Sequence, residues 1–346
     1  MSKAILIKNI YYMLSYAFQV LNQQTYKSIA TESFKNTADM FASILCKGIE
    51  CQLKRYLNRD YVTKAETLSF LRGSIRVTES INQMSFLNKK LVCSFDEFSN
   101  DSYMNRILKS TIILLLKADV STERKKVLKA LLLYFIEVRE IDVYRINWKF
   151  HFNQNNQTYR MLMGICYLTI KGLLQTQSNG KKKLMEFIDE QRMSHLYEKF
   201  VLEYYKKHFR NLNPSANYID WDAQGDIEYL PAMKTDITLT DSLQNRVLII
   251  DTKYYGRTMQ SQFGKSSYHS GNLYQILSYV NNKKAKFDGV VSGMLLYAKT
   301  DEEVTPNQKN LRILGSKFSI QTLDLNLEFA KIEEQLKNIV EEFSNS

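Results

Sequence analysis

The sequence is poor in cysteine, proline and glycine, with 4, 3 and 12 of these residues among 346. No two cysteines form a C-x-x-C pair and the histidines are scattered, so the zinc sites typical of such spacings are not expected. So little proline and glycine is not typical of a disordered chain. No apolar run reaches the roughly 18 residues of a membrane span. Because Lys8 and Asn9 also interrupt the apolar start, we expect no signal peptide, no membrane contact and a cytoplasmic location.

A phosphate-binding loop of the form G-x-x-x-x-G-K-[ST] is also missing, so any nucleotide hydrolysis must come from another chain. What is present is a hydrophobic content of 45%, enough for a buried core, and a net charge of +11 with a pI near 9.2. A protein this basic suits a polyanionic partner such as nucleic acid.

The length predicts two domains, and the polar run 153–157 marks a boundary between residues 1–155 and 156–346. The first half is predicted to be α+β, with a small antiparallel sheet between residues 61 and 98. Its helices are expected at about 8–21, 39–56 (capped by Asp39), 102–116 and 121–137, and an extended segment at 142–152.

The second half is predicted to be an α/β domain with a mixed sheet, because its helical and strand patterns alternate. Helices are expected at about 159–174, 186–209, 271–282 and 327–343, and strands at 233–239, 246–255, 290–298 and 318–323. The strands 233–239 and 246–255 flank a turn-rich segment and should pair antiparallel. The second of them is apolar on both faces, which is typical of a central strand covered on both sides.

Three charged residues mark this hairpin as a candidate site. Asp251 and Lys253 leave the central strand on one face, and Asp236 stands at the start of the neighbouring strand. Buried charges are costly unless they are paired or bind a metal, and two carboxylates are suitable ligands for Mg²⁺. A surface ion pair between Asp251 and Lys253 is the alternative. The spacing is similar to the PD-(D/E)xK nuclease motif, although Pro231 stands five residues before Asp236 and no Pro-Asp dipeptide occurs.

Two helices add candidate side chains. Glu198 shares an apolar helix face with Val201 and Leu202, so we expect it to point inward, as a third metal ligand or in a structural ion pair. Glu203, near lysines at helical spacing, is expected to be a solvated ion-pair residue.

Gln275 and Tyr279 lie four residues apart on one face of the helix at 271–282. Together they are placed to hold a backbone or phosphate group near a metal, and ordinary surface placement is the alternative. The long loop 254–270 lies beside the site, and Arg257, Lys265 and His269 are its candidate contacts to DNA phosphates.

The chain resembles the McrC family, the nuclease subunits of McrBC modification-dependent restriction systems. The resemblance rests on segments spread in order along the chain, which begin at Lys8, Arg72, Phe95, Asn105, Thr235, Asp251 and Asn272. It implies a PD-(D/E)xK endonuclease domain with catalytic Asp236, Asp251 and Lys253. It also implies that Gln275 and Tyr279 match the Q-x-x-x-Y element of RecB-like nucleases, and that Glu198 is their helix carboxylate.

The resemblance further implies a partner, a hexameric ring of the AAA+ GTPase McrB, which recognises DNA containing modified cytosine and is stimulated by the first domain. We expect the segment Arg72–Arg76 to form a projecting tip, with Gly73 supplying a permissive backbone and Arg72 and Arg76 contacting acidic groups of the ring. Two other functions stay open: a non-catalytic adaptor that regulates an AAA+ motor, and a stand-alone DNA repair nuclease.

Overall fold

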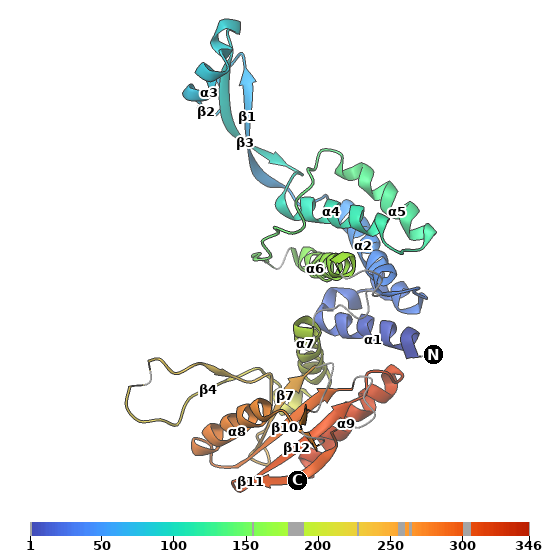
Figure 1. Cartoon of the computed structure of the whole chain (residues 1–346), viewed down its shortest axis with the longest axis vertical. Helices are drawn as coiled ribbons and strands as arrows, with labels where there is room; N and C mark the ends of the chain where they lie inside the picture. The colour runs from blue at the N-terminus through green and yellow to red at the C-terminus, as the bar shows by residue number, and fades with distance from the viewer. Residues whose placement is uncertain are drawn as a thin grey trace. The chain divides into compact units, whose positions relative to one another are not determined.

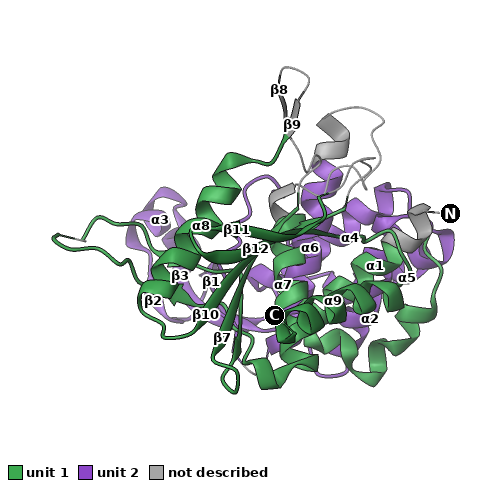
Figure 2. Ribbon diagram, turned by 90° about the horizontal axis from the view of Figure 1, so that it is seen from below, with its two compact units in different colours: residues 1–34, 186–346 green, residues 35–185 purple. Residues whose placement is uncertain are grey.

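A computed structural model describes residues 2–153, 156–178, 190–226, 228–254, 260–262, 265–299 and 306–345. The chain forms two compact units (Figure 2). Unit 1 combines Met1–Phe34 with Glu186–Ser346, and unit 2 is Lys35–Met185. The expected division at residue 155 differs from these units for a physical reason. The helix after the polar run packs on helices that precede it, and the first helix packs on the second half of the chain.

Unit 2 contains a cluster of four α-helices. They are α2 (Thr37–Leu53), α4 (Tyr103–Lys117), α5 (Thr122–Leu132, followed by the 3₁₀ turn Leu133–Phe135) and α6 (Gln157–Ser178). Helices α2 and α4 each contact both α5 and α6. Each helix buries an apolar stripe at helical spacing, which explains why the predicted helices form here.

A three-stranded antiparallel sheet extends from this helical cluster within unit 2 (Figure 1). Its strands are β1 (Asp60–Leu68), β2 (Ser74–Ile75) and β3 (Leu91–Ser99), in the order β1-β3-β2, with α3 (Val77–Asn82) and the 3₁₀ turn Ser85–Asn88 between β2 and β3. The predicted small sheet is therefore confirmed. The segment expected to be extended, 142–152, contains no strand.

Unit 1 is built on four long helices. They are α1 (Ser2–Ala17), α7 (Glu190–His208), α8 (Ser270–Ala285) and α9 (Phe329–Ser344). Short 3₁₀ turns follow α1 (Gln19–Asn22 and Gln24–Thr31) and α7 (Arg210–Leu212). Helix α1 packs on α7, where the rings of Tyr16 and Phe200 meet edge to face at 5.4 Å. The Asn9 amide donates to the carbonyls of Leu325 and Leu327, so the chain start is tied to the segment before α9.

The sheet of unit 1 has five strands in the order β11-β12-β10-β7-β6. The strands are β6 (Ile237–Asp241), β7 (Arg246–Lys253), β10 (Val290–Ala298), β11 (Gln308–Ile313) and β12 (Ser316–Leu323). Strand β10 runs parallel to β7 and β12, and the two outer pairs are antiparallel. The predicted mixed sheet and the interior position of β7 are both confirmed. Two small ribbons complete the unit: β4 (Tyr218–Ile219) with β5 (Met233–Lys234), and β8 (Gln260–Gln262) with β9 (Lys265–Ser267).

Side-chain alternation gives the two faces of this sheet different neighbours. Val247 and Ile249 of β7 belong to a buried cluster with Ile276 and Val280 of α8. Leu248, which points to the other face, lines a cavity with residues of α9. Because both faces are covered, β7 is buried along most of its length, as its apolar sequence predicts.

Candidate active site

Strands β6 and β7 bring the two predicted aspartates to one end of the sheet. The antiparallel register pairs Ile237 with Ile250, and one further step places Asp236 across from Asp251. Asp251 is fully buried, whereas Asp236, directly before β6, is half-buried. The hairpin predicted from the sequence therefore positions both carboxylates as expected.

Asp236 is held by Thr252, which lies between Asp251 and Lys253 in β7. Its Oδ2 accepts a hydrogen bond of 2.7 Å from the Thr252 backbone nitrogen and one of 2.8 Å from the Thr252 hydroxyl. These two donors fix one oxygen of Asp236. Thr252 was not among the predicted site residues, although a hydroxyl residue between Asp251 and Lys253 was a usable signal.

Lys253 connects the carboxylates to helix α8. Its Nζ lies 2.8 Å from Asp251 Oδ2 and donates a 2.9 Å hydrogen bond to Gln275 Oε1. The Gln275 amide in turn donates to the Tyr279 hydroxyl at 2.9 Å. Gln275 and Tyr279, predicted as a pair on one helix face, are thus brought to the site in a chain of contacts that ends at Asp251. Ordinary surface placement does not describe them.

Burial controls the electrostatics of the two aspartates. The pKa of Asp251 is raised from 3.8 to about 7, chiefly by desolvation; the charges of Asp236 and Glu198 contribute to the rise, and Lys253 opposes it. Desolvation and the charge of Glu198 also raise the pKa of Asp236, against the hydrogen bonds from Thr252. Both shifts show that this end of the sheet penalises negative charge, an electrostatic feature that is frequent at functional sites.

Glu198 is near enough to influence both aspartates, but its surroundings differ from those expected. Its side chain is 30% exposed and faces His195 of the same helix, with Oε2 and Nδ1 3.5 Å apart. That contact raises the pKa of His195. Glu203, expected to be the solvated residue, is only 20% exposed and pairs with Lys206 at 2.9 Å. The predicted order of burial is therefore wrong, because both side chains are partly buried and Glu203 is the less exposed of the two.

The residues at the site fit a magnesium ion with few protein ligands. Both oxygens of Asp251 are buried. Oδ2 pairs with the Lys253 ammonium at 2.8 Å, and Oδ1 has no hydrogen-bond donor among the described residues. A buried carboxylate oxygen without a donor, such as Oδ1, is energetically costly unless a cation binds it. Within the described ranges, no three acidic, histidine or cysteine side chains converge as a complete metal cluster. Mg²⁺ needs only one or two carboxylates, because waters and substrate phosphates complete its shell.

The predicted DNA contacts are described only in part. Arg257 lies outside the described residues, and of Lys265 the structure describes the backbone in β9 but not the side chain. His269 is the residue before α8, and its carbonyl accepts from Asn272. A polar pair that the sequence analysis missed follows it: Asn272 is buried and donates to the Tyr297 hydroxyl at 3.0 Å. This pair ties the start of α8 to β10.

The predicted tip in unit 2 forms the edge of the small sheet. Ser74 and Ile75 pair with β3, and Gly73 has a φ of +68° with its Cα pressed against β3. A Cβ there would lie 2.2 Å from the Ser94 carbonyl, so only glycine fits. The Arg72 guanidinium lies 3.9 Å from the centre of the Phe95 ring. Arg76 pairs with Glu79 at 2.7 Å. Both arginines are exposed, and each already has a partner within its own unit.

The fold and the site together define an α+β protein with a carboxylate–lysine centre at the end of a buried strand. The family described as "McrBC 5-methylcytosine restriction system component" matches residues 3–298, and the chain belongs to this family. A curated relative, the "Type IV methyl-directed restriction enzyme EcoKMcrBC" of Escherichia coli (strain K12), is 28% identical over 349 residues, covering 97% of each chain.

Two solved structures from Thermococcus gammatolerans are also similar. One, an assembly of McrB AAA+ hexamers with bound McrC, matches with a TM-score of 0.49 and 16% identity, over 96% of this chain and 76% of the other. The second, a McrBC complex, matches with a TM-score of 0.35 and 18% identity, over 50% and 56%. Among the described residues, no helix has the length and apolar character that crossing a membrane requires.

Proposed function

We propose that the chain is the Mg²⁺-dependent endonuclease subunit of a modification-dependent restriction complex. The observation that carries this proposal is the fully buried Asp251, which lies opposite Asp236 and pairs with Lys253 at 2.8 Å. Membership in a family of restriction system components and the match of the site to the PD-(D/E)xK pattern support it. A structural ion pair between Asp251 and Lys253 would not explain why a second carboxylate, Asp236, is held at the same end of the sheet by Thr252.

The side chains divide the work of phosphodiester hydrolysis. Asp236 and Asp251 would hold the ion, with Glu198 acting on it through the charge it adds nearby. Bound Mg²⁺ would lower the pKa of its water and offset charge on the scissile phosphate. Lys253 stabilises negative charge that develops on the phosphate, and Gln275 and Tyr279 hold its ammonium in place. Thr252 keeps Asp236 oriented.

The proposed substrate is double-stranded DNA containing modified cytosine, and the proposed partner is a hexameric AAA+ GTPase of the McrB kind. The net charge of +11 supports a DNA substrate. Relatives of this chain carry names that describe methyl-directed restriction and complexes with McrB. The partner would supply nucleotide hydrolysis, for which this chain has no phosphate-binding loop.

Unit 2 is the proposed docking element for this partner. Its small sheet and the segments around it expose many large apolar side chains, namely Tyr61, Phe70, Leu71, Ile75, Val77, Ile81, Met84, Phe86, Leu87 and Phe98. Scattered exposed apolar residues are normal, but a concentration on one subdomain is typical of an interaction surface. The exposed Arg72 and Arg76 lie on the same subdomain and are the proposed contacts to acidic groups of the partner.

The test is cleavage of methylated plasmid DNA by the full chain mixed with its motor, with GTP and with Mg²⁺ or EDTA. We expect cleavage only with Mg²⁺, and none from an Asp251→Ala chain that still binds the motor. Stimulation of the GTPase without any cleavage by the wild type would favour the non-catalytic adaptor instead. Cleavage that needs no motor would favour a stand-alone nuclease.

A further inference from the structure

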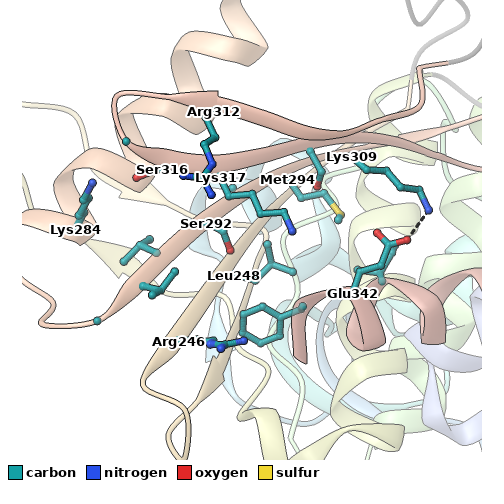
Figure 3. Close-up of a pocket in the computed structure, with 18 residues that line it drawn as sticks. Arg246, Leu248, Lys284, Ser292, Met294, Lys309, Arg312, Ser316, Lys317 and Glu342 are labelled. Carbon is teal, nitrogen blue, oxygen red and sulfur yellow. Dashed lines mark hydrogen bonds and ion pairs between the residues drawn. The ribbon is translucent and has the colours of Figure 1, made fainter. Parts of the chain in front are cut away.

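A second candidate site lies in unit 1, away from the aspartates. It is a cavity of about 350 Å³ between the sheet and helix α9 (Figure 3). Arg246 and Leu248, from the beginning of β7, line it, whereas Asp251 and Lys253 end the same strand. Leu248 also points to the face opposite Asp251, because side chains alternate along a strand. The cavity is therefore separate from the proposed cleavage site, at the other end and on the other face of the sheet.

Cationic side chains dominate the rim of this cavity. Its described lining includes the cations Arg246, Lys284, Lys309, Arg312 and Lys317, against the single carboxylate of Glu342. Glu342 is already engaged, because it pairs with Lys309 and accepts a 2.9 Å hydrogen bond from Gln321. In Figure 3, Arg312 and Lys317 extend from β11 and β12 over the cavity. Lys309 and Lys317 already take part in interactions within the chain, but the lining still carries more positive than negative charge, which a bound anion would offset.

A buried hydroxyl gives an independent indication of a ligand. Ser316 lines the cavity and is only 4% exposed. Among the described residues, no group hydrogen-bonds to its Oγ. A buried hydroxyl without a partner is energetically costly, so it is rarely kept without a reason. A phosphate oxygen in the cavity would accept its proton and remove that cost.

We propose that this pocket binds the phosphate group of a nucleotide-sized ligand. Arginine and lysine together recognise phosphate, the first through its planar fork and the second as a point charge. The inner surface is apolar, formed in part by Leu248, Met294 and Phe343, and suits the flat face of a base or sugar. The volume lies at the lower end of the range for small-molecule sites, about 300–1,000 Å³. The same phosphate chemistry is also offered by a DNA backbone, and the experiment separates the two sources.

Binding is measured by titration calorimetry on the full chain in EDTA, which suppresses phosphate binding through metal at Asp236 and Asp251. The probes are inorganic pyrophosphate, guanosine diphosphate and a short DNA duplex. The test variant is Arg312→Gln with Lys317→Gln. The matched control is Lys331→Gln with Lys337→Gln on the exposed face of α9, which changes the net charge equally and leaves the cavity lining intact.

We expect saturable binding of one guanosine diphosphate per chain, tighter than that of pyrophosphate, and a loss of affinity of at least about tenfold in the test variant only. This corresponds to about 1.4 kcal/mol. Ser316→Ala should weaken binding several-fold without lowering the melting temperature of the ligand-free protein, because it deletes an unsatisfied group. If Ser316 had only a structural role, Ser316→Ala would lower the melting temperature and leave the affinity for guanosine diphosphate unchanged.

The arms of the experiment decide between the outcomes. If the test variant weakens only the binding of the duplex, the phosphate site stands and its source is the DNA backbone. If the test and control variants bind every probe equally well, the proposal is overturned. A Ser316→Ala protein with unchanged affinity for guanosine diphosphate would also refute the role given to the hydroxyl.

Discussion

Asp251→Asn should stabilise the metal-free protein at alkaline pH. The substitution keeps the shape of the side chain, removes its charge and replaces one acceptor oxygen by an amide group that donates hydrogen bonds. In the folded protein, burial raises the pKa of Asp251 to about 7, whereas the unfolded chain has the ordinary value of 3.8. Above pH 7 the native state therefore has to hold an ionised, fully buried carboxylate, for which the Lys253 ammonium compensates only in part.

The sign and size follow from proton linkage. A folded pKa above the unfolded one stabilises the protein fully below pH 3.8, and this stabilisation is lost as the pH rises through about 7. Between pH 5 and pH 8 the wild type should lose about 3 kcal/mol of unfolding free energy from this group, at about 1.4 kcal/mol per pKa unit. The asparagine variant lacks that loss. The attraction of Lys253 is already included, because it helps to set the folded pKa.

The assay is urea unfolding in EDTA at pH 5 and pH 8, followed by tryptophan fluorescence. The chain has only two tryptophans, Trp148 in unit 2 and Trp221 in unit 1, so a Trp148→Phe background lets fluorescence report on unit 1. Asp226→Asn, on an exposed position of unit 1, is the control and should show no pH-dependent gain. An equal difference between Asp251→Asn and wild type at both pH values would refute the reasoning.

Three further predictions concern function. Asp236→Ala should abolish cleavage with the motor and Mg²⁺ while leaving the circular dichroism spectrum and motor binding unchanged, since it removes one proposed ligand at an edge of the sheet. Glu198→Gln should raise the Mg²⁺ concentration needed for half-maximal cleavage, whereas Glu203→Gln should not, since its pair with Lys206 is worth roughly 0–1 kcal/mol. Equal titration curves would contradict the role of Glu198. Arg72→Ala with Arg76→Ala in the full chain should reduce stimulation of GTP turnover by the motor, and full stimulation would remove the tip assignment.

The centre of unit 1 could be predicted because short-range rules determine it. Strand β7 is apolar on both faces, so its interior position followed from the sequence, and alternation placed Asp251 and Lys253 together. The same rules predicted that Gln275 and Tyr279 share one face of α8. The alternation of side chains along a strand predicts the face on which each one lies, but not the residue that it contacts. The contacts of Lys253 with Gln275 and of Thr252 with Asp236 join segments that are 22 and 16 residues apart.

Local patterns also failed where two similar residues competed. The start of α2 was expected to be capped by Asp39, but Asn36 caps it and accepts from the Asp39 nitrogen at 2.9 Å. The Asp39 carboxylate is instead buried and pairs with Arg124 of α5. An aspartate three residues after an asparagine is itself typical of a helix start, so the signal was present. Only the ion pair, 85 residues away in sequence, decides between the two assignments.

The two units could not be read from the sequence because unit 2 is an insertion. The N-terminal residues complete the core of the C-terminal unit: Tyr12 stacks on Phe329 with ring centres 4.4 Å apart, and the Tyr16 hydroxyl lies 2.9 Å from His208 Nε2. A cut at residue 155 would separate α1 from α7 and α6 from α2, and so damage both cores. The chain therefore passes between the units twice, near residues 34 and 185. If a motor binds unit 2 and exerts force on it, that force would reach unit 1, with the proposed cleavage site, through these two connections. In sequence, the second connection comes before α7, the helix that carries Glu198.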